Sequence, residues 1–243
     1  MSRRALSGRV WGGVWRLLRW PIIIGSIALA LLQGYYAFSI ATLNFYNPET
    51  TAFMDAERER LSKGKKTEAR LRHQWVSYSR ISVSAKRAVI AAEDSTFAYH
   101  DGVDWESIEK AARENLRKGT VKRGGSTITM QLAKNLYLSS ERSYIRKAQE
   151  FVLASMLELL VDKRRILEIY LNVAEWGIGV FGVEAAARHY YGVSAAELDD
   201  AQAAWLASIL PAPRRYDRNR ESEWIQEKAL VIQERMSKVS LPK

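Results

Sequence analysis

The stretch "KRGGSTITMQLAKN", residues 122–135, joins two glycines and a Ser/Thr pair to the start of a helical pattern. A helix that follows a glycine-rich turn offers unpaired N–H groups and a positive dipole end to an anion. Thr127, Gln131 and Lys134 are spaced i, i+4 and i+7, which places them on one helix face. The stretch therefore predicts either an anion site or an ordinary helix cap by Ser126 or Thr127.

The sequence that follows residue 75 reads as helical almost throughout. Apolar residues recur at three- and four-residue spacing, strand patterns are weak, and no βαβ alternation is present. We therefore expect an all-α fold. Asp104 and Gly119 are suited to cap one helix, and Ser194 and Glu197 form a capping-box pattern at the start of another. The expected helices occupy residues 84–94, 104–119, 126–138, 143–160, 162–177, 194–210 and 221–238.

The N-terminus combines a basic flank with a long apolar run. Five arginines and no acid lie in the first 19 residues, so the rest of the +10 chain has a net charge of +5. Residues 20–40 carry no charge and would span about 30 Å as a helix. The run is too long, and too aromatic at its end, for a cleaved signal peptide. We expect a retained membrane anchor with its N-terminus in the cytoplasm.

Four segments follow from this pattern. We expect residues 1–19 to form a basic cytoplasmic tail, 20–41 the anchor, 42–75 a charged connector, and 76–243 the globular domain. The chain has no cysteine, which excludes disulfides and thiolate metal sites. An exported domain with a modest positive charge is a poor candidate for binding nucleic acid.

Two adjacent acids, Glu93 and Asp94, end an apolar, alanine-rich helical segment and precede His100. A carboxylate in apolar surroundings can have a raised pKa, which suits a general base or acid. Solvated acids before a turn, and a structural histidine, are the alternatives. No HExxH or similar spacing is present, which disfavours a zinc site.

A third element is the segment "SSERSYIRKAQE", in which Arg142, Arg146 and Glu150 are spaced by four. The three residues lie on one stripe of the helix if the helix begins early enough. This stripe is either an ion pair on a solvated surface or part of a functional site. The apolar sequence that follows favours a buried Glu150, which needs a partner. Two carboxylates, a cationic stripe and an anion site suit the transfer of a group that leaves a phosphate ester.

Four motifs, "EDSTFAYHDG", "GGSTITMQLAKN", "RKAQE" and "KRRILEIYLN", resemble those of the family 51 peptidoglycan glycosyltransferases in order and spacing. The resemblance covers about residues 47–216, and "NVAEWGIGVFGVEAAARHYYG" is most similar to the stand-alone, monofunctional members. It implies a lysozyme-like helical fold with a small membrane-proximal lobe. It also implies polymerisation of lipid II with inversion to β-1,4 linkages, undecaprenyl pyrophosphate being the leaving group.

The resemblance also assigns roles to residues. Glu93 matches the general base, and Glu150 matches a second acid on the leaving-group side, acting through an arginine or a divalent cation, Mg or Mn. Met130 stands where the family commonly has a glutamine, which predicts only a packing change. Residues that would hold the lipid pyrophosphate are Ser126, Gln131, Lys134, Arg142 and Arg146, and residues that would shape the cleft are Asp94, His100, Thr127, Asn135, Lys163, Tyr170 and Asn172.

The expected partners are lipid II, the nascent glycan strand, membrane lipid and proteins of cell division or elongation. The expected location is the inner membrane, with the catalytic domain in the periplasm. A lytic enzyme acting on glycan is one rival interpretation, because lysozyme-like folds also use a glutamate. A catalytically inactive, anchored scaffold is the other. The cationic stripe argues against the first, and the presence of both Glu93 and Glu150 argues against the second.

Overall fold

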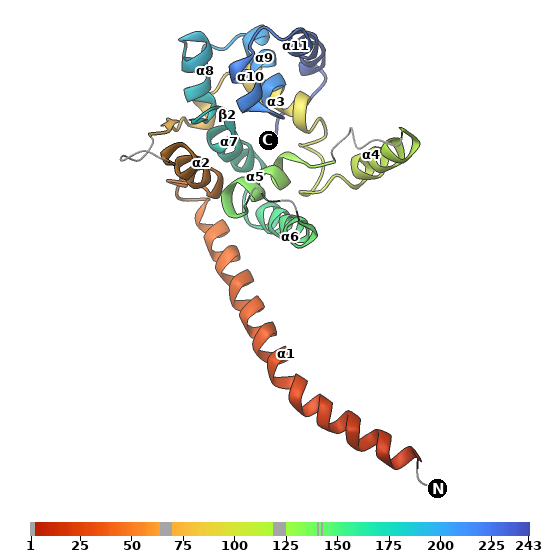
Figure 1. Cartoon of the computed structure of the whole chain (residues 1–243). Coiled ribbons are helices and arrows are strands. Elements are labelled where there is room, and N and C mark those ends of the chain that lie inside the picture. The colour runs from red at the N-terminus through yellow and green to blue at the C-terminus, as the bar shows by residue number, and fades with distance from the viewer. Residues whose placement is uncertain (1–2, 64–69, 119–124, 140, 142) are drawn as a thin grey trace.

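A computed structural model of the chain describes residues 3–63, 70–118, 125–139, 141 and 143–243. The described part is mostly helical, and a long N-terminal helix, α1, extends away from the globular body (Figure 1). Its part from Arg19 to Thr42, 24 residues, is long and apolar enough to cross a membrane. Most of this part is exposed, and Ile40 near its end is buried against the globular body. The helices are α1 (Arg3–Thr42), α2 (Ala52–Ser62), α3 (Val83–Glu93), α4 (Trp105–Lys118), α5 (Ile128–Tyr137), α6 (Tyr144–Leu160), α7 (Lys163–Val173), α8 (Val183–Tyr191), α9 (Asp200–Ile209), α10 (Pro213–Arg218) and α11 (Glu223–Met236), with a 3-10 turn at Tyr78–Arg80.

Two groups of helices build the globular body. Helices α3, α9 and α11 pack against one another, while α5 packs on α6 and α7 (Figure 1). Apolar side chains from both groups, such as Ile90, Leu132 and Leu206, are buried in one continuous core. Because α3 ends and α5 begins where the groups meet, the polar residues at these two helix ends are brought together.

The end of α1 contacts α5 and α6 directly. The amides of Gln33 and Gln149 exchange two hydrogen bonds, each 3.1 Å long, and the hydroxyls of Ser39 and Tyr137 lie 3.1 Å apart. These contacts attach the end of α1 to α5 and α6. The helices that carry Lys134, Arg146 and Glu150 are therefore held close to the membrane-spanning segment.

A small sheet was not expected from the sequence. Strands β1 (Arg72–His73), β2 (Glu175–Gly177) and β3 (Val180–Phe181) form it in the order β1-β3-β2, with β1 parallel and β2 antiparallel to β3. Strands of two or three residues are too short for alternation to be read. The expected helix 162–177 ends at Val173 instead, and the chain then turns back between β2 and β3 at Gly179, where φ is +68°. Gly182 follows β3 with φ +83°, and a Cβ there would lie 2.6 Å from the Asn172 carbonyl oxygen.

The segment expected as a charged connector, residues 42–75, contributes α2 and β1 to the globular body. Glu57 of α2 is fully buried, and its carboxylate pairs with Arg60 at 2.6 Å and with Arg214 of α10 at 2.9 Å. A buried carboxylate needs such partners, and one of them lies far along the chain. Charged composition alone could not reveal this packing, and the division of the chain at residue 76 stays a prediction.

The helix expected to start at Ser194 begins later. Glu197 Oε2 accepts hydrogen bonds from the Ser194 backbone N–H (2.9 Å) and hydroxyl (2.6 Å), but these residues form a turn. The capping box that starts α9 belongs to Asp199 and Gln202. Asp104 accepts from the Ser107 N–H at 2.8 Å at the start of α4, as expected, whereas Gly119 lies outside the described residues.

Candidate active site

Glu93, the last residue of α3, is held by a chain of hydrogen bonds. Gln131 Nε2 donates to Glu93 Oε2 at 2.8 Å, and the Tyr170 hydroxyl donates to Gln131 Oε1 at 2.9 Å. Burial raises the pKa of the Glu93 carboxyl, while the Gln131 hydrogen bond and the charges of Lys228 and Lys134 oppose this. A fixed carboxylate with a raised pKa has the properties of a general base.

The neighbouring acid, Asp94, has a structural role. Its two oxygens lie 2.9 and 3.0 Å from His100 Nε2, and Oδ2 also accepts from the Ile128 N–H at 2.9 Å. The buried Asp94 carboxylate therefore joins the start of α5 to the loop that contains His100. Both acids line the cleft, but the hydrogen bonds of Asp94 fix its shape.

Thr127 is the N-cap of α5. Its extended backbone (φ −77°, ψ 167°) lets Oγ1 accept from the Met130 N–H at 3.1 Å and donate to the Gly102 carbonyl at 2.5 Å. These two contacts make Thr127 the helix cap that the sequence offered as an alternative. The shared face of Thr127 with Gln131 and Lys134 stays a prediction.

The second acid, Glu150, lies on α6 and is 3% exposed. Its Oε2 accepts from Arg146 Nη1 at 2.8 Å, and its Oε1 accepts from Lys147 Nζ at 2.5 Å. Lys147 Nζ also donates to the Ser126 hydroxyl at 3.0 Å. Lys147 was not predicted from the sequence, although its i, i+3 spacing to Glu150 in "RKAQE" indicates an interaction between the two side chains.

Lys134 of α5 interacts with both acids through its charge. The pKa of Lys134 is lowered, mainly by burial and further by the charges of Arg146 and Lys147. The negative charges of Glu150 and Glu93 oppose this shift. The ammonium also lies over the Phe53 ring, 5.4 Å from the centroid, which fixes its position against α2. Lys134 therefore interacts electrostatically with both carboxylates.

A polar cavity of about 260 Å³ opens beside Glu93. Glu93 and Ser126 both line it, and the Ser126 hydroxyl accepts a hydrogen bond from Lys147, which also binds Glu150. Gly125 lines it too, and a Cβ there would come within 3.0 Å of the Ile108 Cα, so this glycine permits the close approach of α4. The polar residues that line the cavity include Glu93, Asp94, Asp104, Lys110, Ser126 and Arg235.

Two cations near Glu93 come from α11 and were not predicted. Arg235 lines the cavity, and Lys228 donates to the Ser208 carbonyl at 3.1 Å while its charge lowers the pKa of Glu93. Helix α11 lies about 130 residues after α3 in the sequence. Nothing in the local pattern of α11 marks either cation as belonging to the site.

Of the remaining predicted residues, some support the fold around the cleft, some are buried in α5, and one lies outside the described residues. Lys163 pairs with Glu158 at 2.6 Å, and the side chain of the buried Asn172 binds both backbone groups of Val76, so both act on the fold around the cleft. Asn135 and Met130 are buried on α5. Arg142 lies outside the described residues, and because α6 begins at Tyr144, the described stripe contains Arg146 and Glu150.

The side chains do not fit a divalent cation held by protein ligands. No group of three or more His, Asp or Glu side chains is close enough for this among the residues that the structure describes. Both oxygens of Glu150 are already bound by Arg146 and Lys147. We therefore derive no step through Mg or Mn.

Comparisons with known proteins agree with this geometry. A family model described as Transglycosylase matches residues 59–237. Relatives named "Biosynthetic peptidoglycan transglycosylase" are 52% identical in Herminiimonas arsenicoxydans (93% of this chain, 98% of the relative), 50% in Janthinobacterium sp. strain Marseille (93% and 98%) and 49% in Laribacter hongkongensis (93% and 100%). The mostly helical, lysozyme-like fold, the paired acids and these matches lead to one conclusion: the chain belongs to the transglycosylase family.

Proposed function

We propose that this transglycosylase polymerises peptidoglycan glycan strands from lipid II, with Glu93 as the base and the α5–α6 cations as the pyrophosphate site. One observation carries the proposal. A carboxylate with a raised pKa lines a polar cleft, and Lys134 interacts electrostatically both with this carboxylate and with Glu150, which binds further cations.

The reaction would begin at Glu93. Its carboxylate takes the proton from the 4-hydroxyl of the lipid II GlcNAc, and this oxygen forms a bond to the anomeric carbon of the growing strand's MurNAc. The bond from that carbon to the pyrophosphate oxygen breaks, with inversion, and undecaprenyl pyrophosphate leaves. Gln131 orients the base by its 2.8 Å hydrogen bond, and Tyr170 in turn orients Gln131.

The charge that develops on the leaving pyrophosphate requires cations. Lys134, Arg146 and Lys147 lie around Glu150 and supply positive charge there, and the Ser126 hydroxyl adds a polar contact. Glu150 acts by holding Arg146 and Lys147 in place for the phosphates. Hydrolysis of a neutral glycosidic bond releases no phosphate, so a lytic enzyme would have no use for this cluster.

The anchor would place this site at the surface of the inner membrane. The arginine-rich N-terminus favours a cytoplasmic tail and a periplasmic catalytic domain. Exposed apolar residues of α4 and α6, among them Trp105, Leu116, Ile145 and Leu159, fit a membrane-proximal lobe that meets the lipid. A substrate with a polyprenyl chain would reach the cations without leaving the bilayer.

The function is tested by giving labelled lipid II to the purified full-length protein in detergent. We expect long glycan strands and released undecaprenyl pyrophosphate, separated by gel electrophoresis and chromatography. Short muropeptides released from preformed glycan, with no strand synthesis, would instead identify a lytic enzyme. Lipid II binding with neither product would identify a scaffold.

Gln131→Ala should move the acidic limb of the pH–rate profile to higher pH. The base must be deprotonated, so kcat/KM falls as the pH drops through the pKa of Glu93. The Gln131 hydrogen bond favours the charged carboxylate and lowers this pKa, so its loss raises the pKa further. Tyr170→Phe, which leaves the Gln131 amide in place, should move the limb less. An unchanged limb in Gln131→Ala would contradict the role of Gln131.

A further inference from the structure

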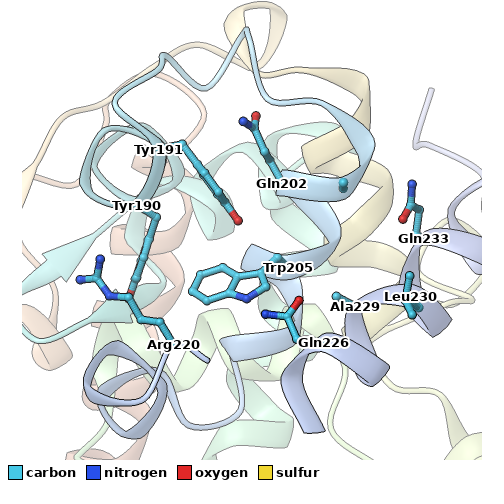
Figure 2. Close-up of a pocket in the computed structure, with 10 residues that line it drawn as sticks. Tyr190, Tyr191, Gln202, Trp205, Arg220, Gln226, Ala229, Leu230 and Gln233 are labelled. Carbon is cyan, nitrogen blue, oxygen red and sulfur yellow. The ribbon is translucent and has the colours of Figure 1, made fainter. Parts of the chain in front are cut away.

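A second cavity, of about 510 Å³, is lined by side chains of α8, α9 and α11 and by Arg220 (Figure 2). Gln226, Leu230 and Gln233 line it at i, i+4 and i+7 and so share one face of the helix. Lys228 and Arg235, which serve the cleft, each lie two residues further on, on the opposite side of the helix. A single helix therefore separates the two cavities.

Aromatic rings form one wall of this cavity. The Trp205 indole meets Tyr190 at 5.1 Å and Tyr191 at 6.1 Å between ring centroids, both edge to face. Figure 2 shows the indole between the two tyrosines and Gln226, with the Tyr191 hydroxyl pointing towards the middle of the cavity. Rings fixed in this way provide rigid apolar area and a polar tip at a low cost in conformational entropy.

The polar groups of the cavity are mostly uncharged. Gln202, Gln226 and Gln233 line it, and in the described part of the chain no hydrogen-bond partner is found for the last two side chains. A free amide offers both a donor and an acceptor. The charge of Arg220 is neutralised within the protein, because its Nη2 lies 2.8 Å from Asp217 Oδ1. The guanidinium also lies over the Tyr190 ring, 4.7 Å from the ring centroid.

This combination favours a neutral, hydroxyl-rich ligand with apolar ring faces. Hydroxyl and acetamido groups donate and accept hydrogen bonds as the glutamines do, and the C–H faces of a sugar ring can pack on indole and phenol. Among the described residues that line the cavity, none is acidic and the single cation, Arg220, is paired within the protein, so a charged peptide finds no free countercharge in this part of the structure.

We propose that this cavity, the α9–α11 groove, binds N-acetylhexosamine units of the glycan strand outside the active cleft, an inference that rests on the proposed function. A helix with its side chains is about 10–12 Å across, so a strand leaving the cleft has a short path around α11 to the groove. A product held there stays with the enzyme between additions, which lengthens the strand made in each binding event.

The test uses the full-length protein in detergent and a β-1,4-linked GlcNAc hexamer as the probe. Titration calorimetry should give a Kd that rises at least about five-fold in Gln226→Ala/Gln233→Ala, which removes two amides and so costs about 1 kcal/mol or more. Glu227→Ala is the matched control, because Glu227 is exposed on α11 beside Gln226 and does not line the groove. We expect its Kd to be unchanged, and circular dichroism verifies the helical content of each variant.

A second readout is the length of the strands made from lipid II. The double variant should make shorter strands at an unchanged initial rate, and Glu227→Ala should make strands of normal length. Equal hexamer affinity in the wild type and the double variant would overturn the proposal. It would also be overturned if the double variant differed from the wild type only in its oligomeric state. Groove-dependent hexamer binding without any polymerisation would support the saccharide site and contradict the proposed function instead.

Discussion

Glu93→Gln should abolish glycan polymerisation, with a fall in kcat/KM of about 10²–10⁴, the usual contribution of a general base. Glutamine keeps the shape of the side chain and can still accept the hydrogen bond from Gln131, but it cannot take a proton from the attacking hydroxyl. Incorporation of labelled lipid II into strands measures the loss. Thermal unfolding should be little changed, because the buried, partly desolvated charge is removed without altering the packing.

Asp104→Asn is the matched control for this variant. Asp104 lines the same cavity, but its oxygens bind the Thr96 hydroxyl at 2.6 Å and the Ser107 N–H at 2.8 Å. Asparagine can keep the helix cap, so we expect activity within several-fold of the wild type. Wild-type rates in Glu93→Gln, or an equal loss in both variants, would refute the assignment of Glu93 as the base.

Lys134→Met should lower kcat by about 10²–10³, the effect typical of removing one preorganised group that stabilises developing charge. Methionine keeps an unbranched chain of similar length, so the loss reports the charge. The Lys134 charge also lowers the pKa of Glu93, so the acidic limb of the pH–rate profile should move to higher pH. Single-turnover rates with lipid II, measured across pH, test both effects.

Lys163→Met makes the same chemical change outside the cleft. Lys163 pairs with Glu158 and donates to the His100 carbonyl, so its loss should lower the thermal midpoint. Activity per folded molecule should stay close to that of the wild type, with no shift of the acidic limb. An equal fall in kcat for both lysine variants would mean that Lys134 acts through the fold and has no specific role at the pyrophosphate.

Much of this protein was readable from local sequence because the signals act over one or two helical turns. The apolar run of α1 marks a membrane-length helix by composition, and the helix that carries Gln131 and Lys134 follows from its periodicity. The Arg146–Glu150 pair also follows from four-residue spacing, which the 2.8 Å contact bears out.

Other features depend on contacts between segments that are far apart in the sequence, and only the tertiary structure shows them. Glu93 and Gln131 are 38 residues apart in the sequence but are joined by a hydrogen bond. Lys147 of α6 donates to the Ser126 hydroxyl just before α5. The two further cations near Glu93, Lys228 and Arg235, belong to α11. The short strands and the buried Glu57 of α2 likewise depend on partners far along the chain. Spacing fixes which side chains share a helix face, but the burial that shifts the pKa of Glu93 and the cations that face it come from tertiary packing, because desolvation and Coulomb interactions depend on distance in space.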